Sequence, residues 1–207
     1  IILFKNIKIN RGLLTGLNEA FIIDEENKQK LLKLDPNNKN IIKPIIIGRD
    51  IFRYEIKKQK DNYLIMTDYD MNIEKEYPSI YEYLLKFKNK AENRDDKGKN
   101  WYNLRACNYY NAFEEENIVW GNISYNNSFT ILEKGEYLNA PANFIRTNNY
   151  DIKFLLGYLN SKIFNWHFKR IGIDLGKAFE WKKIYVEKVF IPIIEKIDHK
   201  NIQVILD

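Results

Sequence analysis

The chain has 207 residues, of which 45% are hydrophobic, so it can bury the core of one sizeable domain, and it has no apolar run approaching the roughly 18 residues of a membrane span. Its single cysteine, Cys107, excludes an internal disulfide and is typical of a reducing, cytoplasmic compartment. The net charge of +5 favours an acidic partner such as nucleic acid, although the many Lys, Asn and Ile residues also fit an AT-rich genome.

The first half of the chain alternates short apolar runs with turn signals. Glycines and Pro36 mark turns. Pro78 suits the first turn of a helix, in which apolar residues recur every three or four positions as far as Ala91. The elements predicted here are strands at residues 1–10 and 20–23, a helix at 25–34, two strands flanking a turn at Gly48, a hairpin at 59–62 that returns through 63–66, a helix over 78–91 and a charged loop at 92–100.

The second half contains the longest helical pattern. A helix is predicted from Asp151, a capping residue type, to Arg170, and its apolar stripe is Ile152, Leu155, Leu156, Leu159, Ile163 and Trp166. The other predicted elements are a short strand near 101, a helical turn at 109–113, a buried strand at 118–124, a hairpin of 129–132 with 137–139, a strand at 143–146, a short helix or strand from 179, and an exit strand or tether at 191–194.

Charge is distributed unevenly along the chain. Residues 1–60 hold 13 Lys and Arg against 7 Asp and Glu, residues 61–140 hold 9 against 14, and residues 141–207 hold 11 against 7. The two ends are therefore basic and the middle is acidic. A basic face for nucleic acid would have to be assembled from both ends of the chain.

The stretch from Trp101 to Tyr125, WYNLRACNYYNAFEEENIVWGNISY, interleaves aromatic residues with Asn and Arg. Arg and Asn side chains can each make paired hydrogen bonds to a base edge, and aromatic side chains can position a nucleic-acid backbone. The alternative interpretation is that the aromatic residues form core and the Asn residues fill loops. Residue types alone leave both interpretations open.

Catalytic patterns are scarce. The two histidines, His167 and His199, lie far apart, so a zinc site is not expected, and there is no nucleophile elbow or Gly-rich phosphate loop. Asp50 followed by Glu55 and Lys57 resembles the magnesium site of many nucleases, and solvated hairpin charges are the alternative. Arg49 either pairs with an acid such as Asp50 or contacts phosphate.

Eight strings of the chain form an ordered set of motifs. They are TGLNEAFIID, IKPIIIGRDIFRY, YPSIYEYLLKFKNK, NRDDKGKNWYNLRA, IVWGNISY, NAPANFI, LLGYLNSKIFNWHFK and EWKKIYVEKVFIP. Taken together and in order, they resemble the TaqI-like C-terminal specificity domain, the target recognition domain of adenine-specific DNA methyltransferases and of type II or IIG restriction-modification enzymes. The resemblance covers nearly the whole chain.

The resemblance implies an α+β fold, with a β-rich N-terminal portion similar to a double β-helix and a C-terminal helical hairpin. It also implies recognition of double-stranded DNA for a methyltransferase domain in the same polypeptide, with or without a fused endonuclease. That methyltransferase would bind S-adenosylmethionine and flip adenine into a pocket with an Asn-Pro-Pro-Tyr motif, and a fused nuclease would use Mg²⁺. The motif is absent here, so we expect no catalytic, cofactor or metal residue in this segment.

We expect residues 1–207 to be one target recognition domain. No internal repeat or low-complexity linker divides the chain. Because it starts at Ile1 without an initiator Met, we read it as a fragment from the C-terminal part of a longer protein, without a secretory segment or membrane partner.

Candidate DNA contacts come from the matching strings. A rival interpretation is a protein-interaction domain that uses the Tyr and Trp surface, and the magnesium nuclease remains a second rival. The residues predicted to contact DNA are Arg49, Arg53, Tyr54, Arg94, Trp101, Tyr102, Arg105, Asn122, Tyr125 and Asn126.

Overall fold

A computed structural model describes residues 2–3, 7–146 and 150–191. The helices are α1 (Asn18–Phe21), α2 (Glu25–Leu34), α3 (Ile73–Glu76), α4 (Pro78–Leu85), α5 (Lys88–Glu92), α6 (Ile152–Leu159), α7 (Lys162–Ile171) and α8 (Lys183–Val186), with single 3₁₀ turns η1 (Pro36–Asn40), η2 (Gly48–Asp50) and η3 (Tyr110–Glu114).

The strands are short and belong to several small sheets. They are β1 (Ile2–Leu3), β2 (Lys8–Arg11), β3 (Ile22–Asp24), β4 (Ile42–Ile46), β5 (Ile51–Phe52), β6 (Glu55–Ile56), β7 (Asn62–Ile65), β8 (Asn117–Trp120), β9 (Ile123–Ser124), β10 (Phe129–Leu132), β11 (Tyr137–Leu138), β12 (Asn143–Arg146), β13 (Ile173–Asp174), β14 (Phe179–Glu180) and β15 (Phe190–Ile191).

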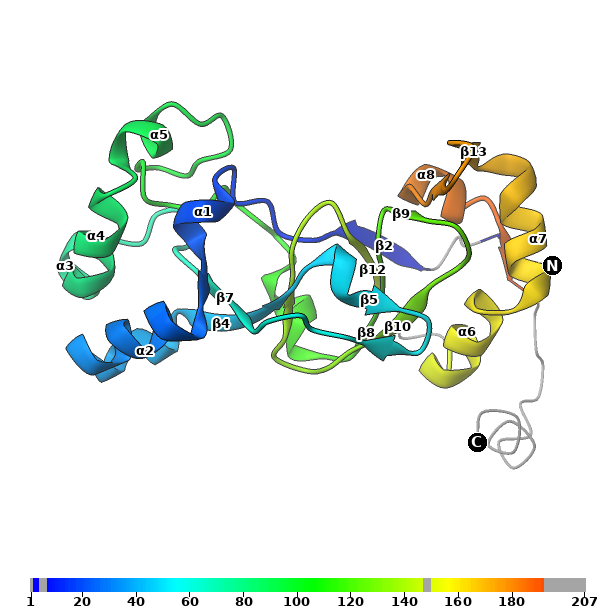
Figure 1. The fold of residues 1–207 in the computed structure, drawn as a ribbon, viewed down its shortest axis with the longest axis horizontal. Coiled ribbons are helices and arrows are strands. Elements are labelled where there is room, and N and C mark those ends of the chain that lie inside the picture. The colour runs from blue at the N-terminus through cyan, green and yellow to red at the C-terminus, as the bar shows by residue number, and fades with distance from the viewer. Residues whose placement is uncertain (1, 4–6, 147–149, 192–207) are drawn as a thin grey trace.

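The molecule is elongated, with helices α2 to α5 at one end, helices α6 to α8 at the other, and the sheets between them (Figure 1). The α+β class, the β-rich N-terminal portion and the consecutive C-terminal helices α6 and α7 are as predicted. The likeness to a double β-helix stays a prediction. No helix among the described residues has the length and apolar content needed to cross a membrane.

The central sheet has the strand order β10-β8-β12-β2 and forms a wall between two hydrophobic cores. Successive side chains of a strand point to opposite faces. In β8, Ile118 and Trp120 therefore join the core beneath α6 and α7, while Val119 joins the core of the other end. All four β8 residues are buried, as expected for a strand covered on both faces.

A second sheet, β11-β4-β7-β3, corrects two predicted pairings. The returning strand β7 pairs with β4 and β3, because β5 and β6 close their own short hairpin. Strand β11 does not form a hairpin with β10. It pairs in parallel with β4, and Tyr137 stacks on Phe113 with ring centroids 4.8 Å apart, which buries β11 in the first core.

The predicted strand at residues 20–23 is also corrected. The chain forms the single-turn helix α1 before entering β3, and the two core residues Ala20 and Phe21 are buried at the end of that turn. The predicted helix at 78–91 is divided into α4 and α5, because Phe87 leaves the helical conformation with φ −108° and ψ 4°. Strands β10 and β12 have the predicted bounds.

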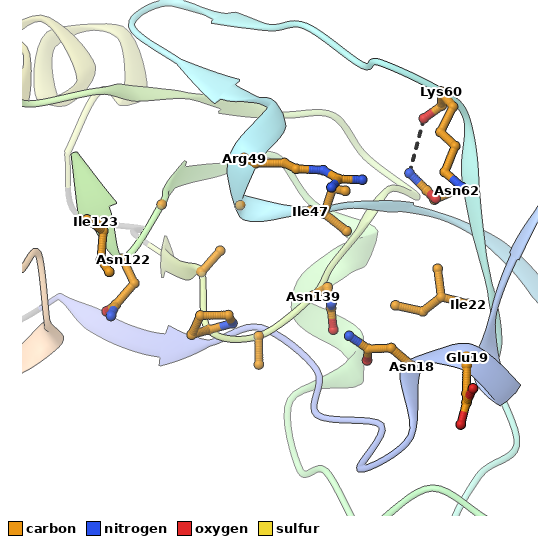
Figure 2. Close-up of a pocket in the computed structure, with 15 residues that line it drawn as sticks. Asn18, Glu19, Ile22, Ile47, Arg49, Lys60, Asn62, Asn122, Ile123 and Asn139 are labelled. Carbon is orange, nitrogen blue, oxygen red and sulfur yellow. Dashed lines mark hydrogen bonds between the residues drawn. The ribbon is translucent and has the colours of Figure 1, made fainter.

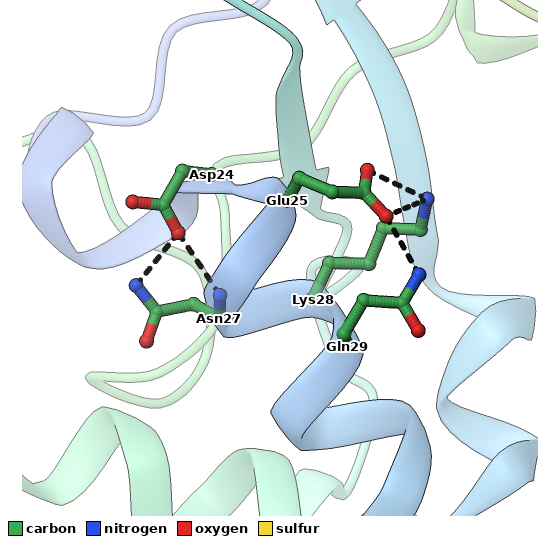
Figure 3. A network of polar contacts seen from close by, with 5 residues as sticks. All are labelled: Asp24, Glu25, Asn27, Lys28 and Gln29. Carbon is green, nitrogen blue, oxygen red and sulfur yellow. Dashed lines mark hydrogen bonds and ion pairs between the residues drawn. The ribbon is translucent and has the colours of Figure 1, made fainter.

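Helix α2 begins and ends where predicted. Asp24 caps it, since its Oδ1 accepts hydrogen bonds from the backbone nitrogen and the side-chain Nδ2 of Asn27, both at 2.9 Å (Figure 3). The backbone hydrogen bond from Asn27 is the main cause that lowers the Asp24 pKa. Glu25, the first residue of the helix, accepts from Gln29 at 2.6 Å and from Lys28 at 3.1 Å.

The predicted helix at 151–170 is two helices, since Asn160 and Ser161 leave the helix. The Asn160 amide exchanges two hydrogen bonds with the backbone of Phe129, at 3.0 and 2.9 Å, and Ser161 caps α7. The break changes the phase of the apolar stripe. Phe164 and Phe168 are the buried α7 residues, whereas the predicted stripe residues Ile163 and Trp166 are 72% and 60% exposed.

The predicted strand at 118–124 is interrupted at Gly121 and Asn122 and continues as β9, which pairs with β14. The segment from 179 begins as strand β14 and continues into α8. Of the predicted exit strand at 191–194, Ile191 lies in β15 and residues 192–194 lie outside the described residues.

Candidate nucleic-acid interface

An open cavity of about 640 Å³ lies in the middle of the molecule, where the β4–η2 corner meets the joint between β8 and β9. Helix α1 and the β11–β12 connection complete its wall. Figure 2 shows Asn122 and Ile123 on one side of the cavity, Asn18, Glu19 and Ile22 on the opposite side, and Arg49 between them.

Two glycines, Gly48 and Gly121, line this cavity and approach each other closely. A Cβ on Gly121 would lie 2.9 Å from the carbonyl oxygen of Gly48, closer than a side chain tolerates. The corner that carries Arg49 and the joint that carries Asn122 can therefore approach only because residue 121 has no side chain.

Three polar side chains of the cavity are available to a ligand. Within the described residues, no hydrogen bond or ion pair engages the side chain of Arg49, Asn122 or Asn139. Arg49 is exposed, Asn122 is half-buried and Asn139 is buried, so their polar groups are presented at different depths. Sequence reasoning predicted Arg49 and Asn122 but missed Asn139, although it lies in the matching string NAPANFI.

The other polar residues of the wall, apart from Lys60, are already engaged. Asn18 accepts a hydrogen bond from the Thr15 hydroxyl at 2.6 Å, and Glu19 pairs with Lys90 at 2.7 Å. Asn62 donates to the carbonyl of Lys60 at 3.1 Å, as Figure 2 shows, while the Lys60 ammonium forms no ion pair with a described residue. Arg49 and Lys60 thus place two positive charges at the cavity, and neither forms an ion pair with a described carboxylate.

Tyr125 and Asn126 form a second exposed cluster, beyond β9, with Lys169 of α7. The Lys169 ammonium lies 4.3 Å from the centre of the Tyr125 ring and 3.0 Å from Asn126 Oδ1, which also accepts from Asn165 at 3.2 Å. Lys169 was not predicted as a contact residue. It is 43 positions from Asn126 in the sequence, so only the fold brings the pair together.

Arg53 and Tyr54 lie on the β5–β6 hairpin, outside the residues that line the cavity. The Arg53 guanidinium donates to the carbonyl of Asn160 at 3.0 Å and thereby links the hairpin to the end of α6. Tyr54 is in the left-handed region with φ 66°, and its backbone nitrogen donates to the carbonyl of Phe129 at 2.9 Å. Both side chains remain exposed.

The prediction of a DNA contact is revised for Arg94 and Tyr102, because each is only 7% exposed. The Arg94 guanidinium donates to the carbonyls of Thr15, Trp101 and Asn103 and lies 4.2 Å from the centre of the Phe21 ring. Burial lowers the pKa of Arg94 to about 10. Its hydrogen bonds stay within the protein, so its role is to join the N-terminal segment to the loop at 94–103.

The rest of the stretch from Trp101 to Tyr125 is mainly scaffold. Trp101 packs in a cluster with Tyr81 and Tyr102, Trp120 is core, and the buried Asn103 donates to two backbone carbonyls. Among the aromatic residues of the stretch, Tyr125 is the most exposed, at 61%. The interpretation as core therefore holds for most of this stretch, and the interpretation as a reading surface remains for its C-terminal end.

Arg105 lies beside a second cavity of about 530 Å³ that also contains Arg11 and Cys107. The Arg105 guanidinium pairs with Asp96 at 2.8 Å, and burial raises the pKa of the Cys107 thiol. Arg105 is exposed, but it belongs to a different surface from Arg49 and Asn122.

The geometry does not unite the predicted nuclease residues. The Asp50 side chain is buried, whereas Glu55 is exposed and pairs with Lys57 at 2.7 Å. Among the described residues, no group of three or more His, Cys, Asp or Glu side chains could hold a metal ion together. The charges of Glu55 and Lys57 are thus solvated, as the alternative interpretation has it, whereas the buried Asp50 fits neither interpretation.

Domains of restriction-modification enzymes have this fold. The type IIL restriction-modification enzyme MmeI in complex with DNA matches with a TM-score of 0.64, at 13% identity over 96% of this chain and 26% of that chain. The type IIG restriction endonuclease BpuSI matches with a TM-score of 0.61, at 13% identity over 99% of this chain and 25% of that chain. The chain spans about a quarter of these solved chains.

The sequence itself identifies the family. The chain belongs to the TaqI-like C-terminal specificity domain family, which matches residues 43–193. A curated relative, the type II methyltransferase M.MjaIV of Methanocaldococcus jannaschii, is 31% identical over 202 residues, which cover 92% of this chain and 67% of that protein. The resemblance seen in the ordered motifs is confirmed.

Proposed function

We propose that this chain is a target recognition domain that reads a short sequence of double-stranded DNA. The observation that carries the proposal is the concave surface where Arg49, Asn122 and Asn139 present unengaged side chains in a member of a specificity-domain family. Asn side chains make paired hydrogen bonds to adenine edges, and an Arg side chain contacts either a phosphate or a guanine edge.

The electrostatics support affinity for a phosphate backbone. Arg49 and Lys60 come from the basic first third of the chain, and Lys169 comes from the basic last third. The fold brings the first pair to the cavity and Lys169 to the neighbouring cluster with Asn126. Contacts of these cations with phosphates would set affinity and register, while the amide groups would select bases.

The recognition domain would serve catalytic domains in the same polypeptide. The type II methyltransferase relative supports a methyltransferase as the whole protein, and we propose that it is adenine-specific. S-adenosylmethionine would be held outside this chain, which contains no Asn-Pro-Pro-Tyr motif, and an attached endonuclease would bring its own Mg²⁺ site. In this chain we assign residues only to DNA binding.

The stretch from Trp101 to Tyr125 suggested the rival role as a protein-interaction domain, but its structure gives this role little support. Tyr102 and Trp120 are buried, and Trp101 packs against other rings, so they offer little surface to a protein partner. The two roles also predict different responses to salt, because counterions are released when lysine and arginine neutralise phosphates.

Fluorescence anisotropy of the 207-residue chain and of the whole enzyme with random-sequence duplex DNA tests the proposal, over a salt range of about 50 to 200 mM. We expect affinity to fall steeply as salt rises. A salt-independent affinity, or no binding by the whole enzyme at the lowest salt, would reject DNA recognition. If the whole enzyme binds DNA and the 207-residue chain does not, the chain needs the catalytic domains in order to bind the duplex.

A further inference from the structure

The joint between β8 and β9 presents two adjacent side chains of different chemistry to the cavity. Asn122 has an amide that no described residue hydrogen-bonds, and Ile123 is 62% exposed although it lies in a strand. The joint therefore offers a ligand an apolar side chain and an amide at adjacent positions, and both side chains line the same cavity.

Trp181 holds this joint at three points. Its carbonyl accepts from the Trp120 indole at 2.7 Å, its backbone nitrogen donates to the carbonyl of Asn122 at 2.8 Å, and its own indole donates to the carbonyl of Ser124 at 2.9 Å. The Trp181 ring stacks on Phe168 with centroids 3.8 Å apart. The joint is therefore fixed to the core beneath α7, and its backbone does not have to be ordered when a ligand binds.

The two side chains match the two halves of one base pair. The amide nitrogen of an Asn side chain donates to adenine N7 while its carbonyl oxygen accepts from the adenine N6 amino group, so one side chain contacts both groups. The thymine of the same pair offers a 5-methyl group, which an apolar side chain contacts. A G·C pair offers neither the methyl group nor the same order of donor and acceptor.

We propose that Asn122 and Ile123 read one A·T pair, with the Asn122 amide on adenine and the Ile123 side chain on the thymine methyl group. This assignment rests on the proposed function and deepens it. It makes the β8–β9 joint a specificity-determining element and leaves affinity to the neighbouring cations Arg49 and Lys60.

Site selection by the whole enzyme from a randomised duplex library is the first experiment. Wild type should require A·T at one position, and Asn122→Ala or Ile123→Ala should relax that position while the others keep their preference. The change in preference should be about tenfold or more for Asn122→Ala. Asn111→Ala and Ile163→Ala, which remove an exposed Asn and an exposed Ile outside the cavity, are the matched controls.

Modified bases then test each contact in the wild-type enzyme, so that misfolding of a variant cannot decide the result. In duplexes of the selected sequence, uracil in place of thymine removes the methyl group and 7-deazaadenine removes N7. Both replacements should weaken binding at the same base pair. Ile123→Ala should bind the uracil and thymine duplexes equally, and Asn122→Ala should bind the adenine and 7-deazaadenine duplexes equally.

Three results would overturn the assignment without touching the proposed function. In the first, both variants keep the preference of wild type at every A·T position of the selected site. In the second, uracil and 7-deazaadenine weaken binding at different base pairs. In the third, neither replacement weakens binding. A whole enzyme that selects no sequence at all would reject the proposed function and this assignment together.

Discussion

Gly121 faces the carbonyl oxygen of Gly48 so closely that a methyl group at residue 121 would lie 2.9 Å from it. This approach joins the corner after β4 to the joint after β8, which are more than seventy residues apart in the sequence. The free side chains Arg49 and Asn122 follow these two glycines directly. The shape of the cavity is therefore set by two backbones and not by the side chains that would touch DNA.

Gly121→Ala should lower both stability and DNA affinity. The added Cβ forces the Gly48 carbonyl to move, at a cost of about 1 to 3 kcal/mol in the free energy of unfolding, and displaces Arg49 with it. Urea denaturation and anisotropy with duplex DNA measure the two effects. Gly135→Ala is the control, because no atom lies within 4 Å of its Cβ and only its φ of 83° is strained, at about 1 kcal/mol. Equal loss of DNA affinity in both variants would contradict the role of the close approach.

Arg94→Ala should destabilise the fold by about 3 kcal/mol or more, since it leaves the carbonyls of Thr15, Trp101 and Asn103 without their donor. The matched change Arg105→Ala removes an exposed guanidinium paired with Asp96 and should cost at most about 1 kcal/mol. Chemical denaturation of both variants distinguishes the two arginines. A small effect at residue 94 would return Arg94 to the list of candidate DNA contacts.

The sequence was sufficient for elements whose signals are local. Helix α2 has its cap at Asp24, its acidic first turn and Pro36 beyond its end, and strands β10 and β12 have clear apolar runs. The prediction of one long helix at 151–170 was wrong, because the break between α6 and α7 depends on Asn160. The Asn160 amide hydrogen-bonds to the backbone of Phe129. Tertiary hydrogen bonds of this kind leave no periodicity in the sequence.

Candidate site residues follow the same rule. Arg49 and Asn122 could be found by residue type, but Arg94 and Tyr102 have the same types as contact residues and are buried. Lys169 joins Asn126 only through the packing of α7 against the joint after β9. Residue type therefore indicates which side chains could contact DNA. Only the fold shows which of these side chains face solvent and which are buried and stabilise the scaffold.

The free energy of unfolding should depend on pH through the ionisation of Glu25. Its pKa is lowered from 4.5 to about 2, chiefly by the hydrogen bond from Gln29 and then by Tyr63 and Lys28. The ionised form is thus favoured by folding, and the stabilisation is fully present above pH 4.5 and is lost as pH falls through about 2.

The difference in unfolding free energy between wild type and Glu25→Gln should therefore be largest at neutral pH and shrink between pH 4.5 and 2. Gln29→Ala should move the Glu25 pKa back toward 4.5, which carboxyl NMR titration would measure. A Glu25 pKa that stays at about 2 in this variant would show that Gln29 is not its main cause.

Arg49→Ala should weaken binding to every duplex and lower the slope of log affinity against log salt by about 0.9, because one phosphate contact is lost. Arg49 is exposed, it lines the cavity, and no described carboxylate pairs with it, so its charge is available to a phosphate. Lys33→Ala removes one exposed charge of α2 that does not line the cavity and should leave the slope unchanged. If Arg49→Ala instead keeps the slope and relaxes the preference at one position, Arg49 reads a base, and if it changes neither, it does not contact DNA.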